Sequence, residues 1–190
     1  MAGARVTSGK RVTLRTVENE DIPFLQRESV TPEIRYSLGN PVRAREQFEV
    51  STERGTDQFL VCLEAKGTDP DDTDETDVRR IGQVNVEDAD YKRPELGYWL
   101  VPEVHGKGYG KESVSLVVDY IFREYDTPAI GAKAFDFNDA SRGLLESLGF
   151  VEEGRQRGFM FVDGEHRDMV LYGLLRDEWL GSEAHLDTYD

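Results

Sequence analysis

The sequence is short of the residues that build disulfides and metal sites. Its one cysteine, Cys62, cannot form a disulfide within the chain or a cysteine-rich zinc cluster. Its three histidines, His105, His166 and His185, form no metal-ligand pair at helical spacing. We therefore expect no bound metal, and nothing in the cysteine usage indicates an oxidising compartment.

Long apolar runs are also missing. No stretch approaches the roughly 20 consecutive apolar residues that a membrane helix needs. Residues 1–10 lack the apolar core of a signal peptide. Both absences favour a cytoplasmic protein that does not contact a membrane.

Positive charge is scarce. The 190 residues carry 23 Lys and Arg against 38 Asp and Glu, a net charge of −15, and only six of the basic residues are lysines. A surface this acidic repels phosphate backbones and anionic lipid, so nucleic acid and membranes are poor candidates as partners. The composition resembles that of proteins from salt-accumulating halophiles, and an ordinary acidic mesophilic protein is the alternative.

The patterns that are present predict one α+β domain. No repeat and no linker divides the chain, so we expect a single domain over residues 1–190. Its core should span about residues 11–179, with a short C-terminal tail over 180–190. The order of elements favours a sheet that is antiparallel at first and contains a β-α-β unit in its second half.

The first half of the chain predicts two strands and two helices. Alternation over 11–15 indicates a half-buried strand, and a helix follows over about 16–31, where Pro32 interrupts it. A second helix is expected over 42–54. The continuous apolar run 59–63 is typical of a strand covered on both faces.

An acidic loop divides this half from the next. Residues 68–77 contain six acids and no base, so they are too self-repelling to pack and should form a solvated hairpin loop. A calcium loop is the alternative, but the spacing lacks its glycine and its distal glutamate.

The second half carries the clearest helix, with apolar residues at helical spacing after the turn at 106–110. The expected elements are strands over 80–86, 95–101 and 129–135, helices over 112–124 and 138–147, and a final hairpin of 150–162 and 167–174 that turns at Asp163-Gly164.

The sharpest local feature is a glycine-rich turn between a strand and this helix. Gly106, Gly108 and Gly110 expose successive main-chain N–H groups at the positive end of the helix, which suits a diphosphate. The alternative is that the glycines only relieve a tight turn. Their spacing matches neither a Walker loop nor the dinucleotide-binding motif.

The turn and its surroundings resemble the GNAT superfamily of acetyl-CoA-dependent N-acetyltransferases, and within it the RimJ/RimL-like ribosomal-protein acetyltransferases. The family signature Gln/Arg-x-x-Gly-x-Gly/Ala maps onto 105–110, where Gly108 and Gly110 match and His105 departs from it. The resemblance covers residues 12–179. It includes the segments Glu95-Leu96-Gly97-Tyr98-Trp99-Leu100, Asn138-Asp139-Ala140-Ser141 and Leu148-Gly149-Phe150.

The resemblance implies a GNAT fold with acetyl-CoA as acetyl donor. That fold is a twisted mixed sheet of six or seven strands flanked by four helices. Its fourth strand, here 95–101, and its fifth, here 129–135, splay apart like a V around the pantetheine arm. The coenzyme-binding residues that it implies are Leu100, Val101, His105, Gly106, Lys107, Gly108, Tyr109, Gly110, Lys111, Asn138 and Ser141.

The resemblance also implies direct attack of a neutral amine on the thioester, which needs a base, an oxyanion donor and a group for the leaving thiolate. Glu95 is the candidate base, with a plain surface residue as the alternative. The oxyanion donor would be a main-chain N–H near Leu100 or Val101. The tyrosine that many members use at the thiolate is replaced by Leu145, so Ser141 is the candidate proton donor or hydrogen-bond partner.

Local roles compete with some of these assignments. Asn138 can be a helix N-cap, and Ser141 can bond only to its own helix backbone. Tyr98 and Trp99 are predicted to be packing residues.

Two functions stay open from the sequence. One is acetyl transfer to a primary amine, either a protein N-terminus or a small molecule such as a polyamine, an amino acid or an aminoglycoside. The other is a degenerate member that binds acyl-CoA as a sensor or interaction module, which the missing tyrosine and His105 would suit. Homodimers are common in the family, but no pattern in the residues locates an interface.

Overall fold

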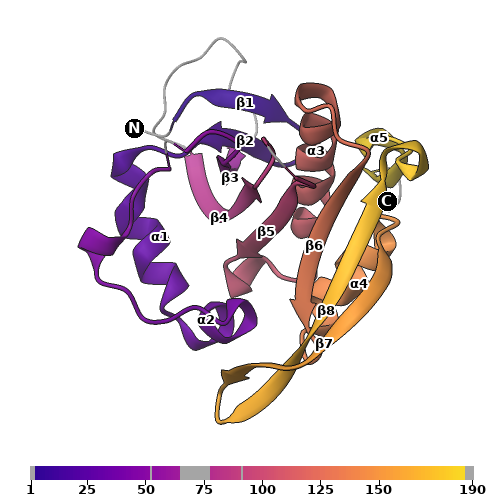
Figure 1. Ribbon diagram of the computed structural model, residues 1–190. Helices are drawn as coiled ribbons and strands as arrows, with labels where there is room; N and C mark the ends of the chain where they lie inside the picture. The colour runs from indigo at the N-terminus through magenta and orange to yellow at the C-terminus, as the bar shows by residue number, and fades with distance from the viewer. Residues whose placement is uncertain (1–2, 52, 65–77, 91, 187–190) are drawn as a thin grey trace.

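The computed structural model describes residues 3–51, 53–64, 78–90 and 92–186 of the chain. Its centre is one mixed sheet with the strand order β1-β2-β3-β4-β5-β6-β8-β7 (Figure 1). The predicted acidic loop 68–77 lies outside the described residues. The strands are β1 (Arg5–Ser8), β2 (Thr13–Thr16), β3 (Asp57–Glu64), β4 (Val78–Glu87), β5 (Glu95–Leu100), β6 (Ala129–Phe135), β7 (Val151–Val162) and β8 (Glu165–Leu175).

The sequence predicts most of this sheet but not its edge. Strand β1 is missing from the prediction because it is short and carries a single large apolar residue, Val6, which is itself exposed. It brings the described sheet to eight strands, one or two more than the six or seven expected. The predicted α+β class and mixed sheet are confirmed.

The helices differ from the prediction in the first half. They are α1 (Ile22–Ser29), α2 (Pro32–Leu38), α3 (Tyr109–Glu124), α4 (Asp139–Ser147) and α5 (Ser182–Leu186). The expected helix over 42–54 is wrong: where the structure describes this stretch, over 42–51 and 53–54, the one helical element is a short 3-10 turn, Arg45–Gln47.

The predicted interruption of the first helix at Pro32 is confirmed, since α1 ends at Ser29, and the second helix begins at Pro32 itself. Proline suits the first turn of a helix because its missing N–H has no partner to lose there. Gly39, with a φ of 67°, ends α2 in the left-handed conformation that favours glycine.

Strand β3 is buried on both sides, as its continuous apolar run predicts. Phe59 and Val61 belong to the main core, on the face that packs against α3 and α4. Leu60 and Cys62 face the opposite way and pack with Leu25 of α1. The sheet therefore has an α3/α4 face and an α1/α2 face, and each has its own apolar cluster.

Strands β5 and β6 part soon after they meet. They are the one parallel pair in the described sheet, and only two residue pairs join them, Glu95 with Gly131 and Leu96 with Ala132. Figure 1 shows the two strands diverging toward their C-terminal ends. The V predicted between 95–101 and 129–135 is confirmed.

The C-terminal segment is not a free tail over its described part. Asp119 of α3 accepts a hydrogen bond from Trp179 Nε1 at 2.7 Å and another from the Ser182 main-chain N–H at 3.2 Å. His185 of α5 stacks on the Trp179 ring. Helix α5 is thereby fixed on α3, which corrects the expected tail.

A buried carboxylate ties the N-terminal hairpin to the start of α3. Glu112, 1% exposed, accepts hydrogen bonds from the main-chain N–H groups of Arg11 (2.7 Å) and Val12 (3.2 Å) and from Arg11 Nε (3.0 Å). Arg11 Nη1 also donates to the Lys107 carbonyl at 2.8 Å. One charged pair thus joins the turn between β1 and β2, the glycine turn and α3.

We expect Glu112→Ala to lower the free energy of unfolding by about 3 kcal/mol, because it leaves buried N–H groups and a guanidinium without their acceptor. Chemical denaturation measures the change. The exposed Glu152→Ala serves as control and should stay within about 0.5 kcal/mol of the parent. A loss at Glu112 no larger than at Glu152 would show that the carboxylate does not hold these elements together.

Candidate functional site

The glycine turn places the start of α3 at the mouth of the V. After β5 a short 3-10 turn (Pro102–Val104) leads to Gly106 and Gly108, which have φ values of 72° and 80°. Gly108 caps α3 without a side-chain hydrogen bond, and the Glu112 N–H is the first to bond back to it. The N–H groups of residues 109–111 therefore point out of the helix start, where an anion is stabilised.

The three glycines are needed for different reasons. Gly106 and Gly108 adopt the left-handed conformation, and a Cβ on Gly106 would meet nothing within 4 Å. A Cβ on Gly110 would lie 2.9 Å from Leu144 Cδ1, so this glycine lets α3 approach α4. The turn is therefore open to a ligand at Gly106 and closely packed at Gly110.

The side chains of the turn fold back on its own main chain. His105 Nε2 lies 2.9 Å from the Leu100 carbonyl oxygen, and Lys107 Nζ donates to the Glu103 carbonyl at 2.9 Å. The Arg11 guanidinium, which the sequence analysis did not single out, lies 4.8 Å from the centre of the Tyr109 ring. These contacts direct His105 and Lys107 to main-chain carbonyls rather than to the N–H groups of 109–111.

The two candidate oxyanion donors, the N–H groups of Leu100 and Val101, point in opposite directions. The Val101 N–H is bonded to the Ile81 carbonyl at 2.8 Å, so it points to β4. Successive N–H groups of a strand alternate in direction, which turns those of Leu100 and Tyr98 toward the parted side of β5. Of the pair named from the sequence, only Leu100 directs its N–H into the V.

Ser141 and Tyr98 meet beside the V. Their hydroxyl oxygens are 2.8 Å apart, and the Tyr98 hydroxyl also lies 3.3 Å from the Ser141 carbonyl. The Ser141 N–H donates to Asn138 Oδ1, so Asn138 does cap α4, and Leu145 is fully buried. The prediction of Tyr98 as a packing residue misses this contact, because the sequence does not show that β5 and α4 bring the two hydroxyls together.

Burial raises the pKa of the Tyr98 hydroxyl well above its ordinary value of 10, although the hydrogen bond with Ser141 works in the opposite direction. The group is therefore a neutral hydroxyl at any physiological pH.

Glu95 lies on the other face of the sheet from this pair. Side chains alternate along β5, so Glu95 shares its face with Trp99, which stacks on Phe24 of α1. Its carboxylate is ion-paired with Lys133 of β6 at 2.5 Å, and its side chain is 31% exposed. The two catalytic candidates, Glu95 and Ser141, are thus reached from opposite faces.

We expect Tyr98 to keep its proton beyond pH 10. Its pKa is higher in the folded than in the unfolded chain, so it stabilises the fold below pH 10 and that stabilisation is lost as the pH rises further. Tyrosinate absorbance during an alkaline titration of the parent and of Tyr98→Phe measures this. If the substitution removes a tyrosine that ionises near pH 10 in the folded protein, Tyr98 is not in the environment described.

Comparison with known proteins agrees with this site. The family model described as an acetyltransferase (GNAT) domain matches residues 11–151. The N-acetyltransferase p20 of Bacillus licheniformis, an uncharacterised protein, is 31% identical over 90% of this chain and 97% of its own length. The ribosomal protein uS5 alanine N-acetyltransferase of Escherichia coli is 31% identical over 58% of this chain and 56% of its own length.

A solved structure shares the fold. The spermidine N-acetyltransferase of Vibrio cholerae, in complex with CoA and spermine, superposes with a TM-score of 0.78 over 91% of this chain and 100% of its own, at 22% identity. The family match covers most of the chain and coincides with the V, the glycine turn and the start of α3. The chain belongs to the GNAT family of acetyltransferases, the enzymes that transfer an acetyl group from acetyl-CoA to an amine.

Proposed function

We propose that this chain acetylates a primary amine, with acetyl-CoA entering from the α3/α4 face and the amine from the α1/α2 face. The observation that carries the proposal is the placement of three features around one opening. The parted strands β5 and β6, the free N–H groups at 109–111 and the Tyr98–Ser141 pair border the same V.

The residues at the turn fit the coenzyme. The N–H groups from Gly106 to Lys111 would hold the linked phosphates, and the open space at Gly106 leaves room for them. The Tyr98 N–H would bond a pantetheine amide, and the Leu100 N–H stays the candidate donor to the thioester oxygen. Phosphates bound by main-chain donors need no contact with a lysine. In concentrated salt, the repulsion between the anionic coenzyme and a chain of charge −15 is screened within about 3 Å.

Ser141 and Tyr98 would act on the leaving sulfur through hydrogen bonds. Acetyl-CoA supplies the thioester. A thiol has an ordinary pKa of about 8.5, whereas the pKa of Tyr98 is raised far above that value by burial. The tyrosine is therefore too weak an acid to protonate the thiolate. It would fix the Ser141 hydroxyl, which donates a hydrogen bond to the sulfur.

Glu95 would accept the amine proton, directly or through a water molecule. Its position on the α1/α2 face is the side from which the amine would come, and its partial exposure leaves it within reach of an acceptor. The ion pair with Lys133 would orient the carboxylate for that step.

The acceptor is a peptide N-terminus or a small amine in this proposal. Among the relatives described above, the Escherichia coli enzyme is named for an alanine of a ribosomal protein, and the Vibrio cholerae structure contains spermine. A homodimer and a cytoplasmic location stay predictions. No helix among the described residues is long and apolar enough to cross a membrane.

Release of free thiol from acetyl-CoA, measured in molar KCl with amines and N-terminal peptides, tests the proposal. We expect Ser141→Ala to lower kcat about tenfold and Glu95→Gln to lower kcat/KM about a hundredfold. The control is Ser147→Ala in the same helix, whose hydroxyl bonds only to the Leu144 carbonyl. It should match the parent.

The same assay can contradict the proposal. Tight binding of acetyl-CoA without thiol release, for any amine tried, would favour the sensor function instead. Full activity of Glu95→Gln would remove Glu95 as the base.

A further inference from the structure

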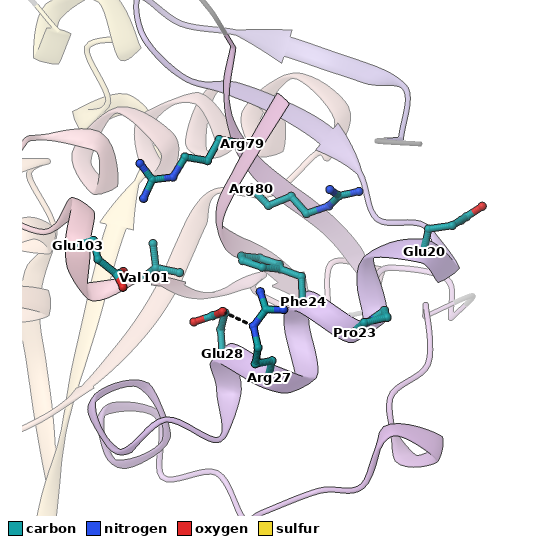
Figure 2. A pocket seen from close by; sticks show the side chains of 9 residues that line it. All are labelled: Glu20, Pro23, Phe24, Arg27, Glu28, Arg79, Arg80, Val101 and Glu103. Atoms are coloured by element: carbon teal, nitrogen blue, oxygen red, sulfur yellow. Dashed lines mark hydrogen bonds and ion pairs between the residues drawn. The ribbon is translucent and has the colours of Figure 1, made fainter. Parts of the chain in front are cut away.

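A pocket lined by charged side chains lies beside the V, on the α1 side of β5. Its volume is about 500 Å³, and it lies between α1, the start of β4 and the end of β5. Phe24 and Val101 lie at its centre, between Arg79 on one side and the Arg27–Glu28 pair on the other (Figure 2). Glu103 completes the rim next to Val101.

The arginines of this pocket differ in how far they are already engaged. Arg80 is bound to the fully buried Asp21 at 2.6 Å and points away from Arg79. Arg27 pairs with Glu28 at 2.9 Å, but its side chain is 68% exposed, so that pair is weak. Arg79 is exposed and has no ion pair within the part of the chain that the structure describes.

The pocket is within reach of the proposed reaction centre. Val101 follows Tyr98 by three residues, which is about 10 Å along a strand. The Phe24 ring, which lines the pocket, stacks at 5.9 Å on Trp99, which lies on the same face of β5 as Glu95. An extended peptide advances about 3.4 Å per residue. Its third side chain would reach the pocket when its amine lies at the V.

We propose that this pocket selects peptide N-termini that carry an acidic side chain at the third residue, and that Arg79 binds that carboxylate. The inference rests on the proposed acetyl transfer. Arg27 adds a second guanidinium across the pocket, and the apolar surface of Phe24 and Val101 packs the methylene groups of the side chain.

The charges of the rim argue against a polyamine in this position. A polyamine would bring ammonium groups against Arg79, and the weak Arg27–Glu28 pair offers it no net negative charge. Glu103 at the rim also limits the choice on the acidic side, because a second carboxylate next to the first would meet it. The pocket therefore suits a single acidic residue rather than an acidic run.

Three hexapeptides, identical except for glutamate, glutamine or lysine at the third residue, test the proposal with spermidine as a fourth acceptor. We expect the glutamate peptide to have a KM about fivefold lower than the glutamine peptide, at equal kcat. Arg79→Gln should abolish this difference, and Arg79→Glu should make the lysine peptide the preferred one. Arg157→Gln, an exposed arginine on β7, is the matched control and should leave the order unchanged.

Calorimetric titration of the same peptides into the protein saturated with CoA measures their binding affinity without turnover. Preferential binding of the glutamate peptide that depends on Arg79 supports the pocket, even where no thiol is released and the proposed acetyl transfer fails. Equal affinity for the three peptides, an equal response to Arg79→Gln and Arg157→Gln, or a preference for spermidine would overturn it.

Discussion

The site depends on how briefly β5 and β6 pair. After Leu96 the two strands diverge, and each keeps only its antiparallel neighbour, β4 or β8. The N–H groups of Tyr98 and Leu100 then face the opening without a strand partner among the described residues. Main-chain groups need hydrogen bonds, and an arm that contains amides can supply them as an added strand would. The opening is thus shaped for an extended ligand.

The groups proposed to act on the coenzyme and those proposed to act on the amine lie on opposite faces of the sheet around this opening. The hydroxyls of Tyr98 and Ser141 lie toward α4, and Glu95 and Trp99 lie toward α1. Each face therefore has its own electrostatic character. On the side proposed for the coenzyme, outward N–H groups offset an acidic chain, and on the side proposed for the amine, paired charges such as Glu95 and Lys133 would influence which amine fits.

The sequence predicts the features of the fold that depend on a short local pattern of residues. The run 59–63 is apolar without interruption because both its faces are buried, and the turn 106–110 shows its glycines directly. Pro32 is a helix boundary as predicted, but the helix that begins there was missed, since proline both ends and begins helices and the pattern alone does not say which. The Tyr98 to Ser141 contact spans elements far apart in the chain, so no spacing could reveal it.

The central claim is that main-chain N–H groups at the start of α3 hold the linked phosphates of the coenzyme. Calorimetric titration of CoA in molar KCl, with the parent and with Gly110→Val, tests it most directly. The account predicts one binding site in the parent and an affinity at least about tenfold lower in the variant, whose side chain would meet Leu144 and Leu100 at the start of α3. No heat with the parent, or equal affinity in the two proteins, would contradict it.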